Sequence, residues 1–409
     1  MHFLKEILKE KCVNEEEQRE ISKNISTVIK AIVQNCKKKN IKASVVLGGS
    51  AAKGTFIKGD FDVDIFVRFD QKYKNKNLSD ILEEIIKPFK PTRIHGSRDY
   101  FQFTAHNIGY EIIPVLYVEK PEEAQNVTDM SPLHVLWVQK HLTEQLKKEI
   151  ILAKLFCKAQ KVYGAESHIK GFSGHVLDIL VVYYGSFLNL LEAAKDWKFH
   201  EFIDIEDYKT ELNKDKISPL IVIDPVQPER NACAALSEEK FLQFKKASEE
   251  FLKSPSKKFF IKKSLNIDNV KKQYPNDNIV LLIIIPLKGK EDITGSKIIK
   301  VLAYISRNLT SSDFIVLDDN WEFEKDKTIA YIVVEKEELS EKKEHMGPPL
   351  ERKKDCKMFR EKHKETIIKD NRLYALIKRD YRRIEDAVKK LLKDEYVKER
   401  VKEIKWVKK

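Results

Sequence analysis

The chain has 409 residues and a net charge of +12, with 76 Lys and Arg against 64 Asp and Glu. This length suggests about two to four domains, and only 13 Gly and 13 Pro exclude a collagen-like or largely disordered chain. The longest apolar run, Ile279–Pro286, is far shorter than the roughly 20 residues of a membrane helix. The excess of positive charge predicts a polyanionic partner, such as nucleic acid or nucleotide phosphates.

The first 141 residues are predicted to form a mixed α/β domain. Asn14 and Glu17 have the spacing of a capping box, and apolar residues then recur at a helical period until the polar stretch at Lys37. Strands are expected over Ser44–Leu47, Asp62–Phe69 and Ile108–Val118. Pro114 is expected to break the last of these strands, because proline has no N–H group to donate to a neighbouring strand.

The rest of the chain is expected to form two more domains. Residues 142–262 are predicted to be mostly helical, with a strong helical stretch over Ser173–Leu191. Residues 263–409 are predicted to form an α+β domain whose end, Glu341 to Lys409, is mostly polar helix. That end holds 24 Lys and Arg against 14 Asp and Glu, which suits contact with RNA phosphates. The expected strands and helix of this last domain are Ile279–Ile285, Ile293–Asn308, Phe314–Leu317 and Thr328–Val334.

The five cysteines are spread along the chain and form no CxxC pair. This pattern predicts reduced thiols, no zinc site and a cytoplasmic location. The first residues lack an apolar core of signal-peptide length, so neither secretion nor a membrane partner is expected.

The most informative stretch joins a glycine turn to an acidic strand. The turn Gly48–Ser50 is followed by Lys53, and then by Asp62 and Asp64, which share a strand face because side chains alternate. Two carboxylates on one face repel each other, and a divalent cation between them is the best explanation. Free backbone N–H groups, a hydroxyl and an ammonium group suit phosphate oxygens. A solvated strand and an ordinary turn would explain each part alone; their combination favours a nucleoside triphosphate held against metal ions.

This combination resembles the DNA polymerase β-like nucleotidyltransferases, which carry Gly-Ser, then Asp-x-Asp, then a third carboxylate on a later strand. Glu111, which alternates with apolar neighbours, stands at the third position, where the family usually has Asp. In nucleotidyl transfer a terminal hydroxyl attacks the α-phosphorus and pyrophosphate leaves. Two Mg²⁺ ions stabilise the attacking oxygen and the leaving oxygen.

Several ordered motifs in the middle of the chain narrow the resemblance. Together they resemble the class I, archaeal-type CCA-adding enzymes, which are tRNA nucleotidyltransferases. The resemblance implies a nucleotidyltransferase head, a helical central domain and an α+β C-terminal domain. It also implies untemplated addition of C, C and A to the 3′ end of tRNA from CTP and ATP. The motifs are Ile151–Phe156, Val162–Glu166, Lys170–Gly174, Val182–Phe187, Asp224–Val226 and Arg230-Asn231.

The resemblance also implies roles for individual residues. Ordinary alternatives exist for each of them, such as a solvated lysine, a packing tyrosine or a surface salt bridge. Lys53 stands where the family often has Arg. Lysine keeps the positive charge but lacks the planar guanidinium group that can form two parallel hydrogen bonds. The implied roles are metal ligands for Asp62, Asp64 and Glu111; triphosphate contacts for Ser50, Lys53, Lys154 and Tyr163; nucleotide contacts for Ser131 and His134; and base recognition for Arg230.

Two other functions stay open at this point. A poly(A) or oligoadenylate polymerase of the same superfamily would share the Gly-Ser and Asp-x-Asp core. A basic RNA-binding protein with a decayed site would account for Glu111 and Lys53. The expected partners are the acceptor arm and 3′ end of tRNA, CTP and ATP, with a homodimer left open.

Overall fold

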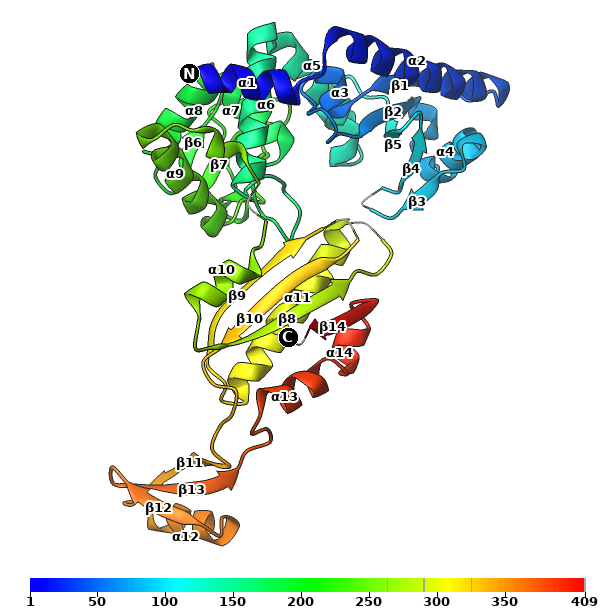
Figure 1. The fold of residues 1–409 in the computed structure, drawn as a ribbon. Helices are drawn as coiled ribbons and strands as arrows, with labels where there is room; N and C mark the ends of the chain where they lie inside the picture. Colours follow the sequence, from blue (N-terminus) through cyan, green and yellow to red (C-terminus); the bar gives the residue numbers. More distant parts are fainter. Residues whose placement is uncertain (97, 263, 290, 325, 408–409) are drawn as a thin grey trace. The chain divides into compact units, whose positions relative to one another are not determined.

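The computed structural model describes residues 1–409 except 97, 263, 290, 325 and 408–409. The chain divides into two compact units, Met1–Lys263 and Ser264–Lys409 (Figure 1). The predicted α+β multidomain fold is confirmed. No single helix of the described chain is long and apolar enough to cross a membrane; α7 (Gly174–Tyr184) and α8 (Phe187–Ala194) reach that length only together, with a bend of 93°.

The first part of unit 1 is built on a five-stranded mixed sheet. Its strand order is β1-β2-β5-β4-β3, in which only β2 and β5 run parallel. One face is covered by α2 (Glu15–Lys38) and α4 (Leu78–Ile86), as Figure 1 shows. The predicted capping box of Asn14 and Glu17 starts α2. The strands are β1 (Ala43–Leu47), β2 (Val63–Phe69), β3 (Thr92–Ile94), β4 (Tyr100–Ala105) and β5 (Ile108–Leu116).

Alternation along β2 separates its two faces. Val63, Ile65 and Val67 are fully buried in the core under α2 and α4. Phe66 lies on the opposite face, in a small apolar cluster with Val135 of α5 (Ser131–His141). The even-numbered positions of β2 therefore point away from the main core, which is the face that carries the acidic residues.

The expectation that Pro114 breaks β5 is wrong. The strand continues to Leu116, and Val67 of β2 is the partner of Pro114. On its other side, β4 pairs with β5 only as far as Phe101 opposite Ile112. Pro114 therefore stands where β5 has a single neighbouring strand, a position that tolerates proline.

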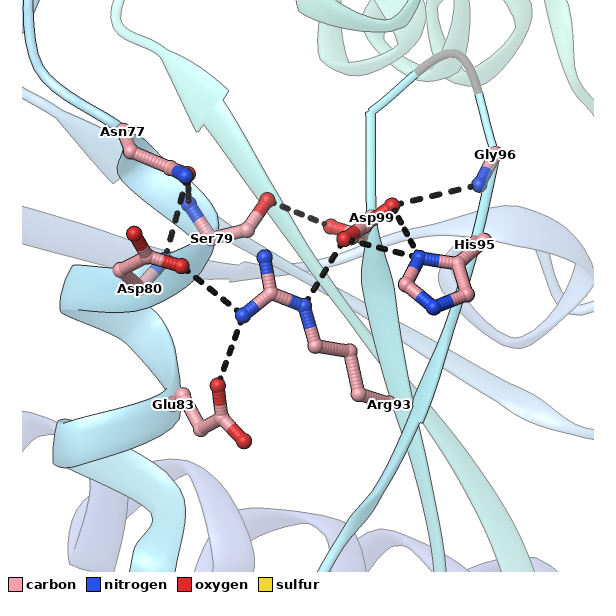
Figure 2. Close-up of polar contacts among 8 residues, drawn as sticks. All are labelled: Asn77, Ser79, Asp80, Glu83, Arg93, His95, Gly96 and Asp99. Atoms are coloured by element: carbon pink, nitrogen blue, oxygen red, sulfur yellow. Dashed lines mark hydrogen bonds and ion pairs between the residues drawn. The ribbon is translucent and has the colours of Figure 1, made fainter.

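A polar network ties α4 to the β3–β4 hairpin. Arg93 of β3 donates through Nη1 to Asp80 and Glu83, both at 2.8 Å, and through Nε to Asp99 at 2.8 Å (Figure 2). The hydroxyl of Ser79 also donates to the carbonyl oxygen of Asp99, at 2.9 Å. These contacts fix the turn end of the hairpin, whose second strand lies next to β5.

The second part of unit 1 is mostly helical. Phe156 lies at the centre of an aromatic core, with ring centroids 5.5 Å from Phe187 and 5.7 Å from Phe251. The helical stretch predicted over Ser173–Leu191 is confirmed and consists of two helices, because Gly185 adopts a left-handed conformation with φ 78° and ends α7. The remaining elements of the unit are α1 (His2–Lys11), α3 (Gly49–Lys53), α6 (Glu144–Ala159), β6 (Glu201–Ile203), β7 (Leu220–Val222) and α9 (Glu238–Lys253).

Unit 2 contains a four-stranded antiparallel sheet in the order β14-β8-β10-β9. Its core is formed with α11 (Glu291–Ser311) and α13 (Ile384–Leu391). A separate three-stranded sheet, in the order β11-β13-β12, packs against α12 (Lys353–Lys362). The other elements are α10 (Ile267–Gln273), β8 (Asn278–Ile285), β9 (Val316–Phe323), β10 (Thr328–Val334), β11 (Lys342–Pro349), β12 (Thr366–Lys369), β13 (Arg372–Lys378), α14 (Glu395–Lys398) and β14 (Glu403–Val407).

The expectation of mostly polar helix from Glu341 to Lys409 is corrected. The described part of this stretch holds four strands and three short helices, in the order β11-α12-β12-β13-α13-α14-β14. Val388 of α13 and Val397 of α14 are fully buried in the core of unit 2, and β14 pairs with β8 along five residues. The end of the chain is therefore part of the fold and is not a separable tail.

Candidate active site

The glycine turn lies against the acidic strand. The amide of Gly48 donates to the carbonyl oxygen of Asp64 at 2.7 Å. A β-carbon on Gly48 would lie 2.3 Å from the ring of Phe66, and one on Gly49 would lie 1.6 Å from Asp64 Oδ2. Gly49 also has φ +54°, in the left-handed region that favours glycine. Both glycines are therefore needed for the turn to approach the carboxylate.

The three predicted carboxylates gather at the junction of β2 and β5. Asp64 and Glu111 are partners in the parallel register of these strands. Asp62 directly precedes β2, and a β-carbon on Gly109 would lie 2.2 Å from its Oδ1 atom. Burial raises the pKa of Asp64 to about 7, and the charges of Glu111 and Asp62 add to this rise, against the opposing effect of Lys53. A set of carboxylate oxygens that repel one another fits a divalent cation.

The β3–β4 hairpin supplies support that was not predicted from the sequence. Gln102 of β4 lies opposite Glu111 and donates to its Oε1 atom at 2.7 Å. Burial raises the pKa of Tyr100 to about 12, and the charges of Glu111 and Asp64 contribute. Recognising β4 as a strand would have indicated both residues. Tyr100 and Gln102 are two positions apart, so they lie on the same face of the sheet as Glu111.

Two of the predicted phosphate ligands share one buried carboxylate. Asp178 of α7 is fully buried and forms an ion pair with Lys53 of α3. Lys154 of α6 lies 3.6 Å from the other oxygen of Asp178 and donates to Thr55 Oγ1 at 2.9 Å. Burial lowers the pKa of Lys154 to about 8, although Asp178 acts to raise it. The structure thus brings Lys53 and Lys154 together, and Asp178 is a residue that the sequence alone did not indicate.

Tyr163 lies beside this ion cluster. A β-carbon on Gly174, at the start of α7, would lie 3.0 Å from the Tyr163 hydroxyl oxygen and 3.9 Å from Lys154 Cε. Burial raises the pKa of the Tyr163 hydroxyl, and the charge of Asp178 adds to that rise. Tyr163 therefore lies near Lys154, the other triphosphate contact that the resemblance implies for this part of the chain. Ser50, in α3, and Ser131, the first residue of α5, are both half-buried.

A second polar cluster gathers around Asp224, two residues after the end of β7. His134 of α5 approaches Asp224 Oδ1 with its Nε2 atom at 3.0 Å, and Arg230 Nη1 donates to Oδ2 at 2.5 Å. The backbone amides of Val226 and Gln227 donate to Oδ1 at 2.9 and 3.1 Å. Burial raises the pKa of Asp224, but the hydrogen bond and charge of His134 outweigh it and hold the pKa below the usual range. The structure thus brings together His134 and Arg230, which were predicted separately.

His175 of α7 extends this cluster. Its ring centroid lies 4.5 Å from that of His134, and burial lowers its pKa to about 3. His134, His175 and Asp224 each offer a ligand atom, and these atoms lie within 4.8 Å of one another. Asp224 already accepts from a guanidinium cation and three further N–H groups. Asp224 therefore already has a positively charged partner in Arg230. Compared with His134, His175 and Asp224, the carboxylates of Asp62, Asp64 and Glu111 are the better ligand set for Mg²⁺.

Three family models match successive parts of the chain. They describe a nucleotidyltransferase domain at residues 29–98, the second domain of tRNA nucleotidyltransferase at residues 148–261, and the C-terminal domain of CCA-adding enzyme at residues 286–404. A CCA-adding enzyme of Nanoarchaeum equitans is 35% identical over 82% of this chain and 84% of its own length. The chain belongs to the CCA-adding enzyme family. A second CCA-adding enzyme, from Saccharolobus shibatae, is 31% identical over 91% of this chain and 88% of its own length.

This CCA-adding family member is a tRNA nucleotidyltransferase, as its relatives and domain matches agree. A protein outside this family has a similar fold. A cytoplasmic RNA terminal U-transferase of known structure superposes with a TM-score of 0.51, at 13% identity, over 64% of this chain and 98% of that one. Asp62 and Asp64 fall within the nucleotidyltransferase domain match, and Asp178 and Asp224 within the second-domain match.

Proposed function

We propose that the enzyme adds C, C and A to the 3′ end of tRNA by using CTP and ATP, with Asp62, Asp64 and Glu111 as the ligands of two Mg²⁺ ions. The observation that carries this proposal is the pairing of Asp64 with Glu111 directly below the Gly48–Ser50 turn. When bound, Mg²⁺ would supply positive charge to the attacking hydroxyl, the transferred phosphoryl group and the departing pyrophosphate. Gln102 holds Glu111 in place, so the longer side chain keeps a fixed position.

The triphosphate is proposed to lie between α3 and α6. Ser50 and Lys53 would contact it from one side, and Lys154 and Tyr163 from the other. Lys53 and Lys154 both lie within reach of Asp178, so their ammonium groups are already close together in the protein without a nucleotide. A triphosphate carries several negative charges and would satisfy both groups more fully than one carboxylate.

The base is proposed to be selected by Arg230, with His134 and Ser131 near the sugar. Arginine only donates hydrogen bonds. Cytosine and adenine offer ring nitrogen acceptors at their pairing edges, whereas uracil and guanine present an N–H donor there. A base that presents a donor to the guanidinium leaves buried groups unpaired, which disfavours it.

Incubation with tRNA that lacks its CCA end tests this function. With CTP alone, two C residues are expected to be added, and with CTP and ATP a single A is expected to follow. The products can be resolved on a sequencing gel from labelled nucleotides. An oligoadenylate polymerase would instead extend any RNA end with repeated A from ATP alone, and that result would favour the alternative. An RNA-binding protein with a decayed site would incorporate nothing.

Basic residues on α12 are proposed to hold the RNA. Lys353, Lys357 and Arg360 are exposed and follow helical spacing, so they share one side of α12. Changing all three to Glu is expected to weaken tRNA binding by at least about tenfold at low salt and to reduce the salt dependence of the affinity. Electrophoretic mobility shifts at several salt concentrations measure both effects. Removing everything after Asp370 would be a poor test, because it deletes β14 from the core sheet.

The matched control makes the same charge change on α2. Lys23, Lys30 and Lys37 are exposed on that helix, and changing them to Glu alters the net charge equally. The control is expected to leave most of the affinity intact. Equal losses in both triple variants would show that only the total charge matters.

The proposed domain division at 141/142 and 262/263, a homodimer and a cytoplasmic location remain predictions.

A further inference from the structure

The cluster around Asp224 has a feature that the proposed base contact does not itself require. Asp224 is fully buried, whereas the side chain of Arg230 is 34% exposed. The main chain also joins the two residues, because the amide of Asp224 donates to the carbonyl oxygen of Arg230 at 3.0 Å. Together with the 2.5 Å contact of Arg230 Nη1 to Oδ2, this gives the arginine two attachments to one residue.

We propose that Asp224 is a positioning residue that fixes the guanidinium of Arg230 and the ring of His134 together, and thereby sets the preference for C and A over U and G. This inference rests on the proposed base contact of Arg230. Asp224 does not itself touch the nucleotide in this arrangement, because the N–H groups of its neighbours occupy both of its oxygens.

The carboxylate decides which hydrogen-bonding groups remain for a ligand. Asp224 is ionised at neutral pH, so it can only accept, and the Nε2 atom of His134 must carry the proton in their contact. This contact uses the Nε2 atom of His134 and leaves its Nδ1 atom for a hydrogen bond with a sugar hydroxyl of the nucleotide. Neighbouring His175 has a pKa lowered to about 3 and stays neutral, so it adds no competing charge to the cluster.

The ion pair also decides how well Arg230 discriminates. One of its five N–H groups is used by Asp224, and the remaining donors are held in a fixed plane. A fixed row of donors fits the acceptors of cytosine or adenine and meets the N–H of uracil or guanine unfavourably. A freely rotating guanidinium could turn away from that N–H, and the penalty on the wrong base would fall.

Asp224→Asn tests the inference, because it keeps the shape and removes the charge. With full-length enzyme and tRNA ending in C, the KM for CTP is expected to rise about tenfold, while kcat changes less than about threefold. The ratio of kcat/KM for CTP to that for UTP is expected to fall about tenfold. Asp196→Asn, an equal change at an exposed site, is the control and should alter neither value.

A structural role would give a different pattern. In an Arg230→Ala background, Asp224→Asn is expected to leave the CTP to UTP ratio unchanged, because Asp224 acts through that arginine. A fall of the ratio in that background, or an unchanged ratio in the single variant, would overturn the inference. If Asp224→Asn does not fold by circular dichroism, Asp224→Glu carries the test, since it keeps the charge and displaces the guanidinium. Failure of the wild-type enzyme to add C or A would instead overturn the proposed function.

Discussion

Asp64→Asn is expected to reduce incorporation of C and A by on the order of 10³-fold, the loss typical of removing one preorganised electrostatic contact in an active site. Asp64 faces Glu111 across β2 and β5 and lies under the turn at Gly49. An amide at this position keeps the shape but lacks the charge that would hold a divalent cation. Binding of tRNA is expected to stay within about twofold, because the change removes no positive charge.

The measurement is a single-turnover assay with tRNA ending in C, labelled CTP and excess Mg²⁺. The control is Asp70→Asn, directly after the far end of β2, where the carboxylate pairs with Lys42 on the surface. That variant should retain activity within about threefold, as is usual for a surface ion pair. Activity of Asp64→Asn close to the wild-type level would show that the proposed metal ligands are wrong.

Thermal stability separates this outcome from misfolding. A carboxyl whose pKa is raised from about 3.9 to about 7 binds its proton more tightly when folded, so stability falls as the pH rises through this range. Above about pH 7, the ionised Asp64 destabilises a protein without metal. In the presence of EDTA, Asp64→Asn is therefore expected to melt at least about 2 °C above the wild-type enzyme. A lower melting temperature would indicate a damaged fold and would leave the activity loss without the proposed cause.

Local patterns predicted the parts of the fold that depend on local chemistry. The capping box at Asn14 and the alternation around Asp62 and Asp64 gave α2 and β2 within a residue of their ends. Glu111 was assigned as the third carboxylate from the resemblance to nucleotidyltransferases, and the structure makes it the partner of Asp64 in the parallel register of β2 and β5. The β3–β4 hairpin was missed, because β3 has only three residues and the hairpin is tied to α4 by Arg93 (Figure 2).

The partners of the predicted ligands could not be found in the same way. Lys154 and Asp178 lie on different helices, and Lys53 comes from a third. No period or spacing links these positions, so only the packed structure shows that one carboxylate serves two lysines. Likewise, Asp224 was noted as part of a motif, but its contacts with His134 and Arg230 depend on how α5 packs near β7. The sequence therefore predicted site residues better than the residues that hold them.

Asp178→Asn is expected to destabilise unit 1 by about 3–5 kcal/mol, because it leaves two buried ammonium groups without a carboxylate. Lys53 and Lys154 are 8% and 3% exposed, so water cannot replace the lost charge. Urea unfolding followed by tryptophan fluorescence, to which Trp137 and Trp197 of this unit contribute, measures the effect. A loss below about 1 kcal/mol would mean that solvent or other groups satisfy the lysines.

The loss should depend on pH in a defined direction. Burial already lowers the pKa of Lys154 to about 8, and removing the charge of Asp178 lowers it further. A lysine with a depressed folded pKa binds fewer protons when folded, so the stability of the variant recovers as the pH rises toward 8. The difference from wild type is therefore expected to be largest at low pH and to shrink as pH 8 is approached. A difference that stays constant up to pH 8 would contradict this account.

Replacing all three charged side chains tests whether the cluster serves stability or function. In Lys53→Met, Lys154→Met and Asp178→Leu combined, no buried charge is left uncompensated, so the stability is expected to return to within about 1 kcal/mol of wild type or above it. The KM for CTP is expected to rise at least about tenfold, because Lys53 and Lys154, two of the four proposed triphosphate contacts, are gone. A stable triple variant with an unchanged KM would show that the cluster only joins α3, α6 and α7. A stable variant with a raised KM would mean that the buried charges are kept for the nucleotide, at no gain to the fold.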